Sequence, residues 1–381
     1  MHNKNKLFGK IICLLGVWLG GCIEPYDLPE SAAGQDFLVV DGGVNIEEGL
    51  GQVVLARTQN LADKGQPTFE NGAQVTVETE QNQSFRLSER QQGLYLATGL
   101  PLTFGQKYRL RVRTRTGQEY LSAFVSTQRT PEIDSVTWHV EREGVVGKVN
   151  THDPENDTRY YRWEYSETFE YVSGAYSNYQ YLNGTIQPRP FEENIYICYR
   201  TDPSRRILTE STVRLSEDVV RDFPLTFHLG WSPQMGRKYS ILVKQSAISK
   251  EEFAYWQMLK KNTENVGTLF DAQPSQVTGN LLNTQNPEEP VIGYFSARSV
   301  QEKRRFITST ELFARGLRYV PPRCQVDSVD VGEVKNLIGG NLLIDGIIDG
   351  MGNIIGYTMA TASCADCRFR GGTTTKPDFW N

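Results

Sequence analysis

Histidine is scarce in this chain, and the short motifs that mark common catalytic sites are missing. Four of the 381 residues are histidine, and the three beyond the N-terminal segment, His139, His152 and His228, are far apart in sequence. None belongs to an HExxH motif, and the chain has no GxSxG, GxGxxG or phosphate-binding glycine loop. We therefore expect a protein that is not an enzyme and that holds no cofactor or metal.

An excess of positive charge and a long apolar run are also missing. The chain has 40 basic and 45 acidic residues, a formal net charge of −5, which does not resemble a nucleic-acid-binding protein. Beyond residue 22 no window approaches 18 consecutive apolar residues, because glycine, asparagine and aspartate interrupt the best one, residues 337–359. The sequence thus predicts neither nucleic-acid binding nor a transmembrane helix.

The N-terminal segment predicts a cleaved signal peptide and a lipid anchor. A basic start runs into the apolar residues 11–19, which have about half the length that a membrane-spanning helix needs. Small residues then precede Cys22, as lipoprotein processing requires, so we expect residues 1–21 to be removed and Cys22 to carry acyl chains. An ordinary signal peptide is the disfavoured alternative. Residues 22–35, rich in Pro, Ala, Gly and acid, predict a tether.

The cysteines predict disulfides. With Cys13 in the signal peptide and Cys22 lipidated, four cysteines remain: Cys198, Cys324, Cys364 and Cys367. An even number outside the cytoplasm favours two disulfides, with three possible connectivities. A zinc site is the alternative, because the two terminal cysteines have half of the usual ligand spacing, but the other two are isolated.

Residues 36–130 predict an immunoglobulin-like or transthyretin-like β-sandwich. Short alternating runs separated by turn residues give about seven strands. In residues 107–113, Tyr108, Leu110 and Val112 alternate with arginines, so one face of this strand enters a core and the other meets water. Tyr108 either bonds back to the preceding corner of the sandwich or is a core aromatic, and both alternatives agree with the fold.

Residues 131–381 predict a second, larger β-rich domain with one amphipathic helix near residues 250–264. Ser249 can cap this helix, and Glu252 can reciprocate in a capping box. Phe253, Trp256 and Leu259 follow at three-residue steps, so we expect an apolar stripe that faces a sheet. The fold class is therefore mainly β.

Aromatic residues gather between residues 161 and 181. Tyr161, Trp163 and Tyr165 are two residues apart and are expected on the core face of one strand. Further rings follow among Ser, Gly and Asn, a composition typical of adaptable contact surfaces, and they are the candidate binding residues: Phe169, Tyr171, Tyr176, Tyr179 and Tyr181. The alternative is that they are edge-strand and core aromatics.

Two acidic turns could supply oxygen ligands to calcium: residues 153–157, and Asp345 with Asp349. Neither follows the twelve-residue calcium-loop pattern, so solvated turns are favoured. Convergence of His152, Asp153 and Asp157 on a nucleophile would instead indicate an enzyme.

Several segments resemble the outer-membrane lipoproteins of Bacteroidota that are grouped as domain of unknown function 4249 (DUF4249) and are often encoded beside TonB-dependent receptors. The resembling segments are the lipobox with residues 22–26, the early runs FLVVDGGV and VVLARTQ, residues 160–170, residues 249–283, the run PVIGYFSARSVQEKRRFI, and residues 364–380.

This resemblance implies an outer-membrane location, in the periplasm or at the cell surface, and a role beside a β-barrel receptor, but no catalytic residues. We therefore expect a non-catalytic accessory subunit of a TonB-dependent transporter, which captures substrate or takes part in gating. The alternatives are a structural subunit of an outer-membrane secretion or assembly complex and an extracytoplasmic hydrolase.

Overall fold

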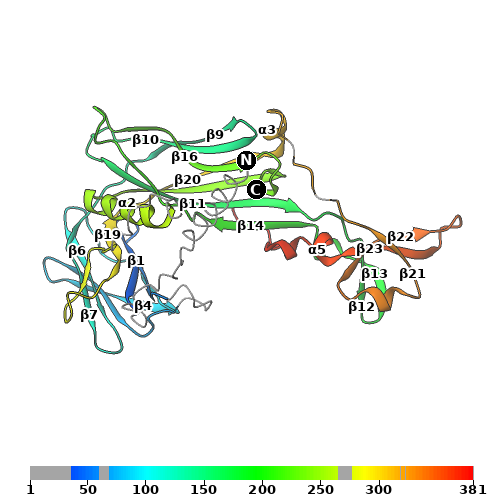
Figure 1. Cartoon of the computed structure of the whole chain (residues 1–381), viewed down its shortest axis with the longest axis horizontal. Coiled ribbons are helices and arrows are strands. Elements are labelled where there is room, and N and C mark those ends of the chain that lie inside the picture. The colour runs from blue at the N-terminus through cyan, green and yellow to red at the C-terminus, as the bar shows by residue number, and fades with distance from the viewer. Residues whose placement is uncertain (1–35, 60–67, 265–276, 318, 322, 381) are drawn as a thin grey trace, which may run out of the picture.

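The structure is a computed structural model that describes residues 36–59, 68–264, 277–317, 319–321 and 323–380 (Figure 1). The predicted signal peptide, the lipidated Cys22 and the tether lie outside the described residues. Among the residues that are described, no helix has the length and apolar character needed to cross a bilayer. The mainly β fold predicted from the sequence is confirmed, with sheets in a sandwich-like arrangement.

The described strands form three units, of which the first is one long antiparallel sheet with a parallel strand at its end. Its order is β18-β7-β6-β3-β4-β5-β2-β1-β19, and β8 pairs with β6. The strands are β1 (Leu38–Asn45), β2 (Leu50–Arg57), β3 (Gln74–Thr79), β4 (Ser84–Gln91), β5 (Leu94–Ala97), β6 (Lys107–Arg113), β7 (Glu119–Ser122), β8 (Val125–Ser126), β18 (Leu281–Asn283) and β19 (Ile292–Arg298).

The alternation predicted for residues 107–113 is confirmed, because Tyr108, Leu110 and Val112 are fully buried in the core of this first unit. The Tyr108 hydroxyl accepts a hydrogen bond from the Thr103 N–H at 2.8 Å and donates one to the Thr103 carbonyl at 3.1 Å. Both alternatives for Tyr108 therefore hold: it is a core aromatic and it fixes the corner before its strand.

Two strands of the first unit come from residues 131–381, which the sequence predicts to form the second domain. β19 pairs in parallel with β1, with Val39 opposite Ile292, and β18 pairs with β7. At Gly293, where φ is +128°, an added Cβ would lie 1.8 Å from the Val40 carbonyl oxygen, so this close pairing requires glycine. These pairings join segments about 250 and about 160 residues apart, and pairings over such separations leave no local pattern in the sequence, which is why β18 and β19 were assigned to the wrong unit.

The second unit packs two sheets over an aromatic core. One sheet has the order β16-β10-β9 and the other β14-β11-β17-β20, with β15 paired to β11. Tyr161 and Trp163 are fully buried and Tyr165 is partly buried against the same core, as predicted. The strands are β9 (Ile133–Glu141), β10 (Gly144–His152), β11 (Tyr160–Val172), β14 (Ile197–Pro203), β15 (Leu208–Ser211), β16 (Val219–Leu229), β17 (Lys238–Ala247) and β20 (Gln301–Thr308).

The predicted helix is α2 (Lys250–Glu264), which lies between the first and second units (Figure 1). Ser249 caps it, because its hydroxyl accepts the Glu252 N–H at 3.1 Å. The Glu252 carboxylate, predicted to complete a capping box, is buried and instead accepts hydrogen bonds from Trp256 at 3.2 Å and Arg298 at 3.0 Å. The side chain expected to serve the helix terminus thus joins the helix to β19.

The third unit, which we call the arm, consists of residues 179–188 and 327–361 and projects along the long axis of the molecule (Figure 1). Its sheet has the order β21-β23-β22, and the hairpin of β12 and β13 packs beside it. The strands are β12 (Tyr179–Leu182), β13 (Thr185–Pro188), β21 (Asp327–Asp330), β22 (Asn341–Ile348) and β23 (Ile354–Thr361). Short helices around the second and third units are η1 (Phe191–Glu193), η2 (Pro233–Met235), α3 (Ser309–Phe313), α4 (Val334–Leu337), α5 (Ala362–Ala365) and η3 (Cys367–Arg370).

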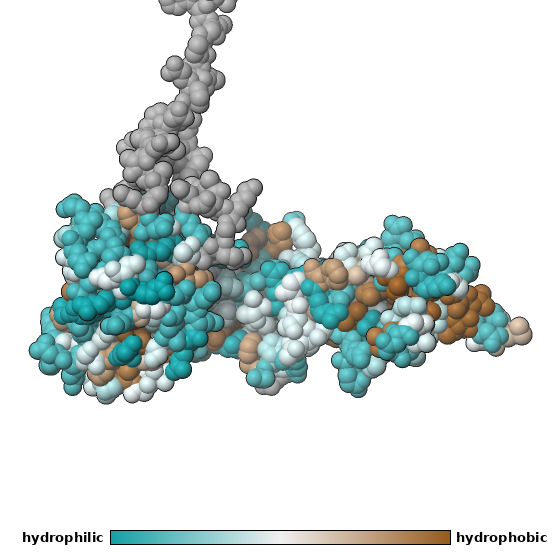
Figure 2. Space-filling model, turned by 90° about the horizontal axis from the view of Figure 1, so that it is seen from below, coloured by the Kyte–Doolittle hydropathy of each residue, from teal (hydrophilic) through white to brown (hydrophobic). Residues whose placement is uncertain are grey.

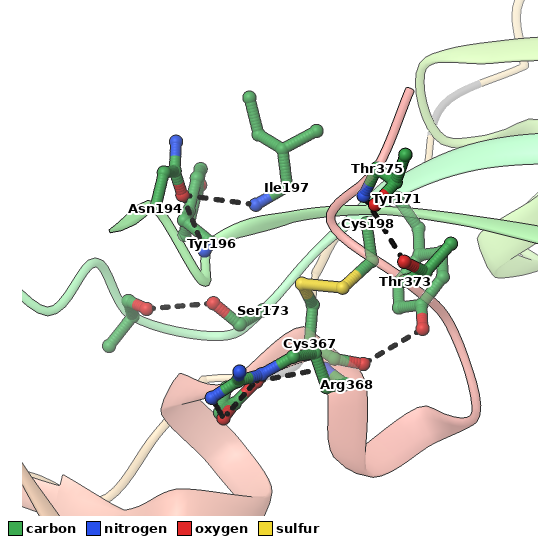
Figure 3. The surroundings of a disulfide bond; sticks show 12 residues. Tyr171, Ser173, Asn194, Tyr196, Ile197, Cys198, Cys367, Arg368, Thr373 and Thr375 are labelled. Atoms are coloured by element: carbon green, nitrogen blue, oxygen red, sulfur yellow. Dashed lines mark hydrogen bonds and ion pairs between the residues drawn. A yellow bond between two sulfur atoms is a disulfide. The ribbon is translucent and has the colours of Figure 1, made fainter. Parts of the chain in front are cut away.

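The two predicted disulfides are confirmed, and the structure selects one of the three connectivities: Cys198 pairs with Cys367, and Cys324 with Cys364. The first bond fastens η3 to β14 and is fully buried at both cysteines (Figure 3). The second joins the segment before β21 to α5. Together they fix the C-terminal part of the chain at the base of the arm.

Candidate functional site

Two of the five aromatic residues predicted to form a binding surface are buried. Phe169 is 4% exposed and Tyr171 is 2% exposed, and their rings lie 5.7 Å apart in the core of the second unit. The Tyr171 hydroxyl donates to the Cys367 carbonyl at 2.8 Å, beside the disulfide (Figure 3). The binding prediction is wrong for these two residues, because the inward face of β11 continues to its end and the core alternative applies.

The other three predicted binding residues lie at the arm. Tyr176 is 38% exposed and its ring is 5.3 Å from that of Tyr196. Tyr179 meets Tyr357 edge to face at 5.2 Å, and Tyr181 is partly buried against the same small core. Tyr179 and Tyr181 therefore belong to the core of the arm itself, and of these three residues only Tyr176 is exposed.

The acidic turn at residues 153–157 is a self-contained structural turn. The Asp153 carboxylate accepts N–H groups of Glu155 at 3.0 Å, Asp157 at 3.0 Å and Thr158 at 2.8 Å. Burial would raise the pKa of Asp153, but these hydrogen bonds outweigh it and hold that pKa below its ordinary value. The favoured reading of a solvated turn agrees with this geometry, since the carboxylate is used within its own turn.

The histidine next to this turn is engaged elsewhere. Nδ1 of His152 lies 2.9 Å from the Asp134 carboxylate, whereas Asp153 is directed into its turn. His152, Asp153 and Asp157 line one hollow of about 700 Å³, in which the ring of His152 faces Asp134 and the Asp153 carboxylate is held within its own turn. Within the described part of the chain, no group of three or more His, Cys, Asp or Glu side chains could hold a metal ion.

The contact between α2 and β19 brings together residues that no single stretch of sequence contains. Outward-facing residues of β19 meet the helix: the ring of Tyr294 lies 5.7 Å from that of Tyr255, and Arg298 pairs with the buried Glu252 at 3.0 Å. A buried ion pair is strongly destabilised when one partner is lost, so this contact fixes how the helix sits on the first unit.

A hollow of about 650 Å³ opens beside this contact, between α2 and the β7–β8 segment of the first unit. Its walls include rings, a thioether and amides, notably those of Phe124, Gln128, Tyr255, Met258, Asn280 and Tyr294. Pockets for small molecules have this size, are largely apolar with a few polar groups, and are common where two units meet. The hollow is therefore the candidate binding site.

The polar groups of this hollow are mostly neutral. Burial raises the pKa of Tyr255 to about 12 and raises that of Tyr294 above its ordinary value, so both hydroxyls stay protonated at neutral pH. The charge of Glu252 is balanced by Arg298, and Glu251 is the acid that remains on the wall. Such a site suits an uncharged molecule with an apolar face and a few hydrogen-bonding groups.

Comparison with known proteins gives a family and little else. Residues 23–304 match the family model described as domain of unknown function (DUF4249), a range that ends before the sheet of the arm. The chain matches no curated protein. A solved structure from Bacteroides uniformis, of a protein whose name refers to carbohydrate binding, shares 12% identity over 57% of this chain and 92% of its own, with a TM-score of 0.12. A score this low supports no argument about fold or ligand.

Proposed function

The chain belongs to the DUF4249 family, and we propose that it is a non-catalytic lipoprotein of the outer membrane that captures a small molecule for a β-barrel, TonB-dependent transporter. The hollow between α2 and the first unit carries this proposal. It has the volume of a small-molecule pocket, and it lies at a junction held by a buried ion pair. A preformed pocket of this kind binds without ordering a loop first, which favours capture.

The chemistry of the walls supports an uncharged ligand. Phe124 is partly exposed in the hollow, and the guanidinium of Arg109 lies 4.7 Å from the centre of its ring. Met258 and Tyr294 add apolar surface, and Gln128 adds an amide. One wall acid, Glu251, would repel an anion, whereas a neutral molecule meets no opposing charge.

The predicted anchor supports a partner in the same membrane. If Cys22 carries lipid, the tether of about 14 residues reaches at most about 50 Å, so the folded units stay near the bilayer surface. A protein confined in this way meets a neighbouring membrane protein at a high effective concentration, so even a weak contact keeps the two together.

Purification of the tagged full chain from detergent-solubilised native membranes tests the proposal. We expect a TonB-dependent barrel in near-equal amount, identified by mass spectrometry. Secretion or assembly factors in its place would support a structural subunit instead. Recovery of the chain without a stoichiometric partner would refute the transporter role.

A variant that fills the hollow separates capture from partner binding. Ala254 is exposed on α2 and lines the hollow, so Ala254→Trp should occupy it without disturbing the core. We expect this variant to keep its barrel and to lose any small molecule that mass spectrometry detects with the wild-type complex. Thr263→Trp, on the opposite side of the same helix, is the matched control. Equal ligand retention in both variants would refute capture in this hollow.

A further inference from the structure

The outer end of the arm exposes apolar side chains that no described part of the protein covers. Met351 at the tip of the β22–β23 hairpin is 86% exposed and Ile348 beside it is 64% exposed, and Ile354 and Ile355 are also exposed. Figure 2 shows hydrophobic residues gathered over this end of the molecule, while the opposite end is mostly hydrophilic. A cluster of large apolar side chains at one exposed point marks an interaction site more often than scattered ones do.

The tip that carries these side chains is rigidly built. The Asp349 carboxylate accepts the N–H groups of Met351 at 2.8 Å and Asn353 at 2.9 Å, and the Asp349 N–H donates to the Asn353 carbonyl at 2.9 Å. Ile348 and Ile354 are paired across the two strands. The apolar groups are thus held outward by a hydrogen-bonded turn, so little conformational freedom is lost when they are covered.

The charges of the arm restrict what can cover its tip. Between residues 327 and 361 the arm has one basic residue, Lys335, and these acids: Asp327, Asp330, Glu333, Asp345 and Asp349. An anionic lipid surface would repel an arm of this charge. A protein surface with an apolar depression bordered by lysine or arginine would match both the apolar tip and the acidic arm.

We propose that the tip of the arm inserts into an apolar depression with a basic border on a partner protein. The identity of that partner as the transporter rests on the proposed function, whereas the chemistry of its surface rests on the arm alone. The arm is joined to the second unit through the segment before β12, in which the Ser177 hydroxyl donates to the Leu343 carbonyl at 2.7 Å and the Asn178 N–H donates to the Ile344 carbonyl at 2.9 Å. A docked partner would therefore be held in a fixed direction relative to the first two units.

A photo-crosslinking amino acid at position 351 of the full chain tests where the tip lies in intact cells. We expect an adduct with one protein, and peptide mapping should place the crosslink in an apolar segment next to lysine or arginine. Adducts with lipid alone would show that the tip enters the membrane and would overturn the proposal. Crosslinks that appear only within this chain would also overturn the proposal.

Substitutions at the tip test its contribution to binding. Met351→Asp should reduce the recovery of the crosslinked partner from native membranes at least tenfold. Val213→Asp, at a 53% exposed apolar residue outside the arm, should leave recovery unchanged. Circular dichroism and intact disulfides check that both variants fold. If Met351→Asp does not reduce recovery of the partner, the arm proposal is overturned, even when the partner is a barrel. If Met351→Asp does reduce recovery but the partner is not a barrel, the arm proposal is supported and the transporter role is refuted.

Discussion

Replacing Cys198 and Cys367 by alanine should destabilise the protein by about 5 kcal/mol, because their disulfide closes a loop of sequence separation 169. The value follows from the chain entropy that such a crosslink removes from the unfolded state, and it changes slowly with loop length. Both cysteines are fully buried in the core that also contains Tyr171, so removal of their disulfide lowers the stability of the second unit itself.

The second disulfide provides a comparison within the same chain. Cys324–Cys364 has a sequence separation of 40, for which the same relation gives about 4 kcal/mol. It joins segments at the base of the arm, away from the aromatic cores of the first two units. The Cys324→Ala/Cys364→Ala variant should therefore lower the stability of the arm while leaving most of the sandwich intact.

Urea denaturation without reductant measures both effects. Tryptophan fluorescence follows the second unit, in which Trp163 is fully buried, and hydrogen exchange follows the arm. Wild-type protein in excess reductant should have the same free energy of unfolding as a variant that combines both pairs of cysteine-to-alanine substitutions. A loss below about 1 kcal/mol for Cys198→Ala/Cys367→Ala would refute the argument, since the unfolded chain would then gain little freedom from losing this crosslink.

Three further predictions concern single contacts. Tyr108→Phe removes both hydrogen bonds to Thr103, in the corner before β6, and should destabilise the first unit by about 1–3 kcal/mol in urea denaturation. Arg298→Met leaves the buried carboxylate of Glu252 without its cation and should cost about 3–5 kcal/mol in the same assay, with partial recovery when Glu252 is also replaced by Gln. The hydrogen bond to Asp134 raises the pKa of His152 above its ordinary value, so Asp134→Asn should lower that pKa in an NMR titration.

Each of these predictions has an outcome that contradicts it. Wild-type stability of Tyr108→Phe would mean that the corner holds without the hydroxyl. If Arg298→Met and the double variant were equally unstable, the buried charge of Glu252 would not be the cause. For His152 the stabilisation should be present below pH of about 6.5, the unfolded value, and should disappear as pH rises through the raised folded value. If the contribution of the His152–Asp134 pair to the free energy of unfolding increased as pH rises over that range, the effect assigned to Asp134 would be refuted.

Local patterns in the sequence predicted the elements whose causes are local. The alternation around Tyr108 depends only on the two-residue period of a strand, and all three alternating apolar residues are buried. Ser249 caps α2 because a hydroxyl at that position reaches the N–H three residues on. The parity of the cysteines likewise predicted two disulfides, although their connectivity required the three-dimensional structure.

Contacts between distant segments escaped prediction for a physical reason. Glu252 suits a capping box in sequence, but an arginine 46 positions later gives its carboxylate a stronger, charged partner in a buried place. The hollow combines residues near positions 124, 255, 280 and 294, none of which has a distinctive local pattern. Phe169 and Tyr171 are a different case, because the local two-residue period that places Tyr161 inward continues through them, while their composition resembles that of surface aromatics.

The parallel pairing of β19 with β1 has a consequence for the export that we propose. If the chain is exported from its N-terminus, Val39 is delivered about 250 residues before Ile292, its partner, so β1 waits with one edge unpaired while residues 133–247, most of the second unit, emerge. An unpaired edge strand is a template for aggregation. An exported chain should then need protection by a periplasmic chaperone until residue 298 has crossed. Truncations before β19 should be degraded even though they retain most strands of the first unit.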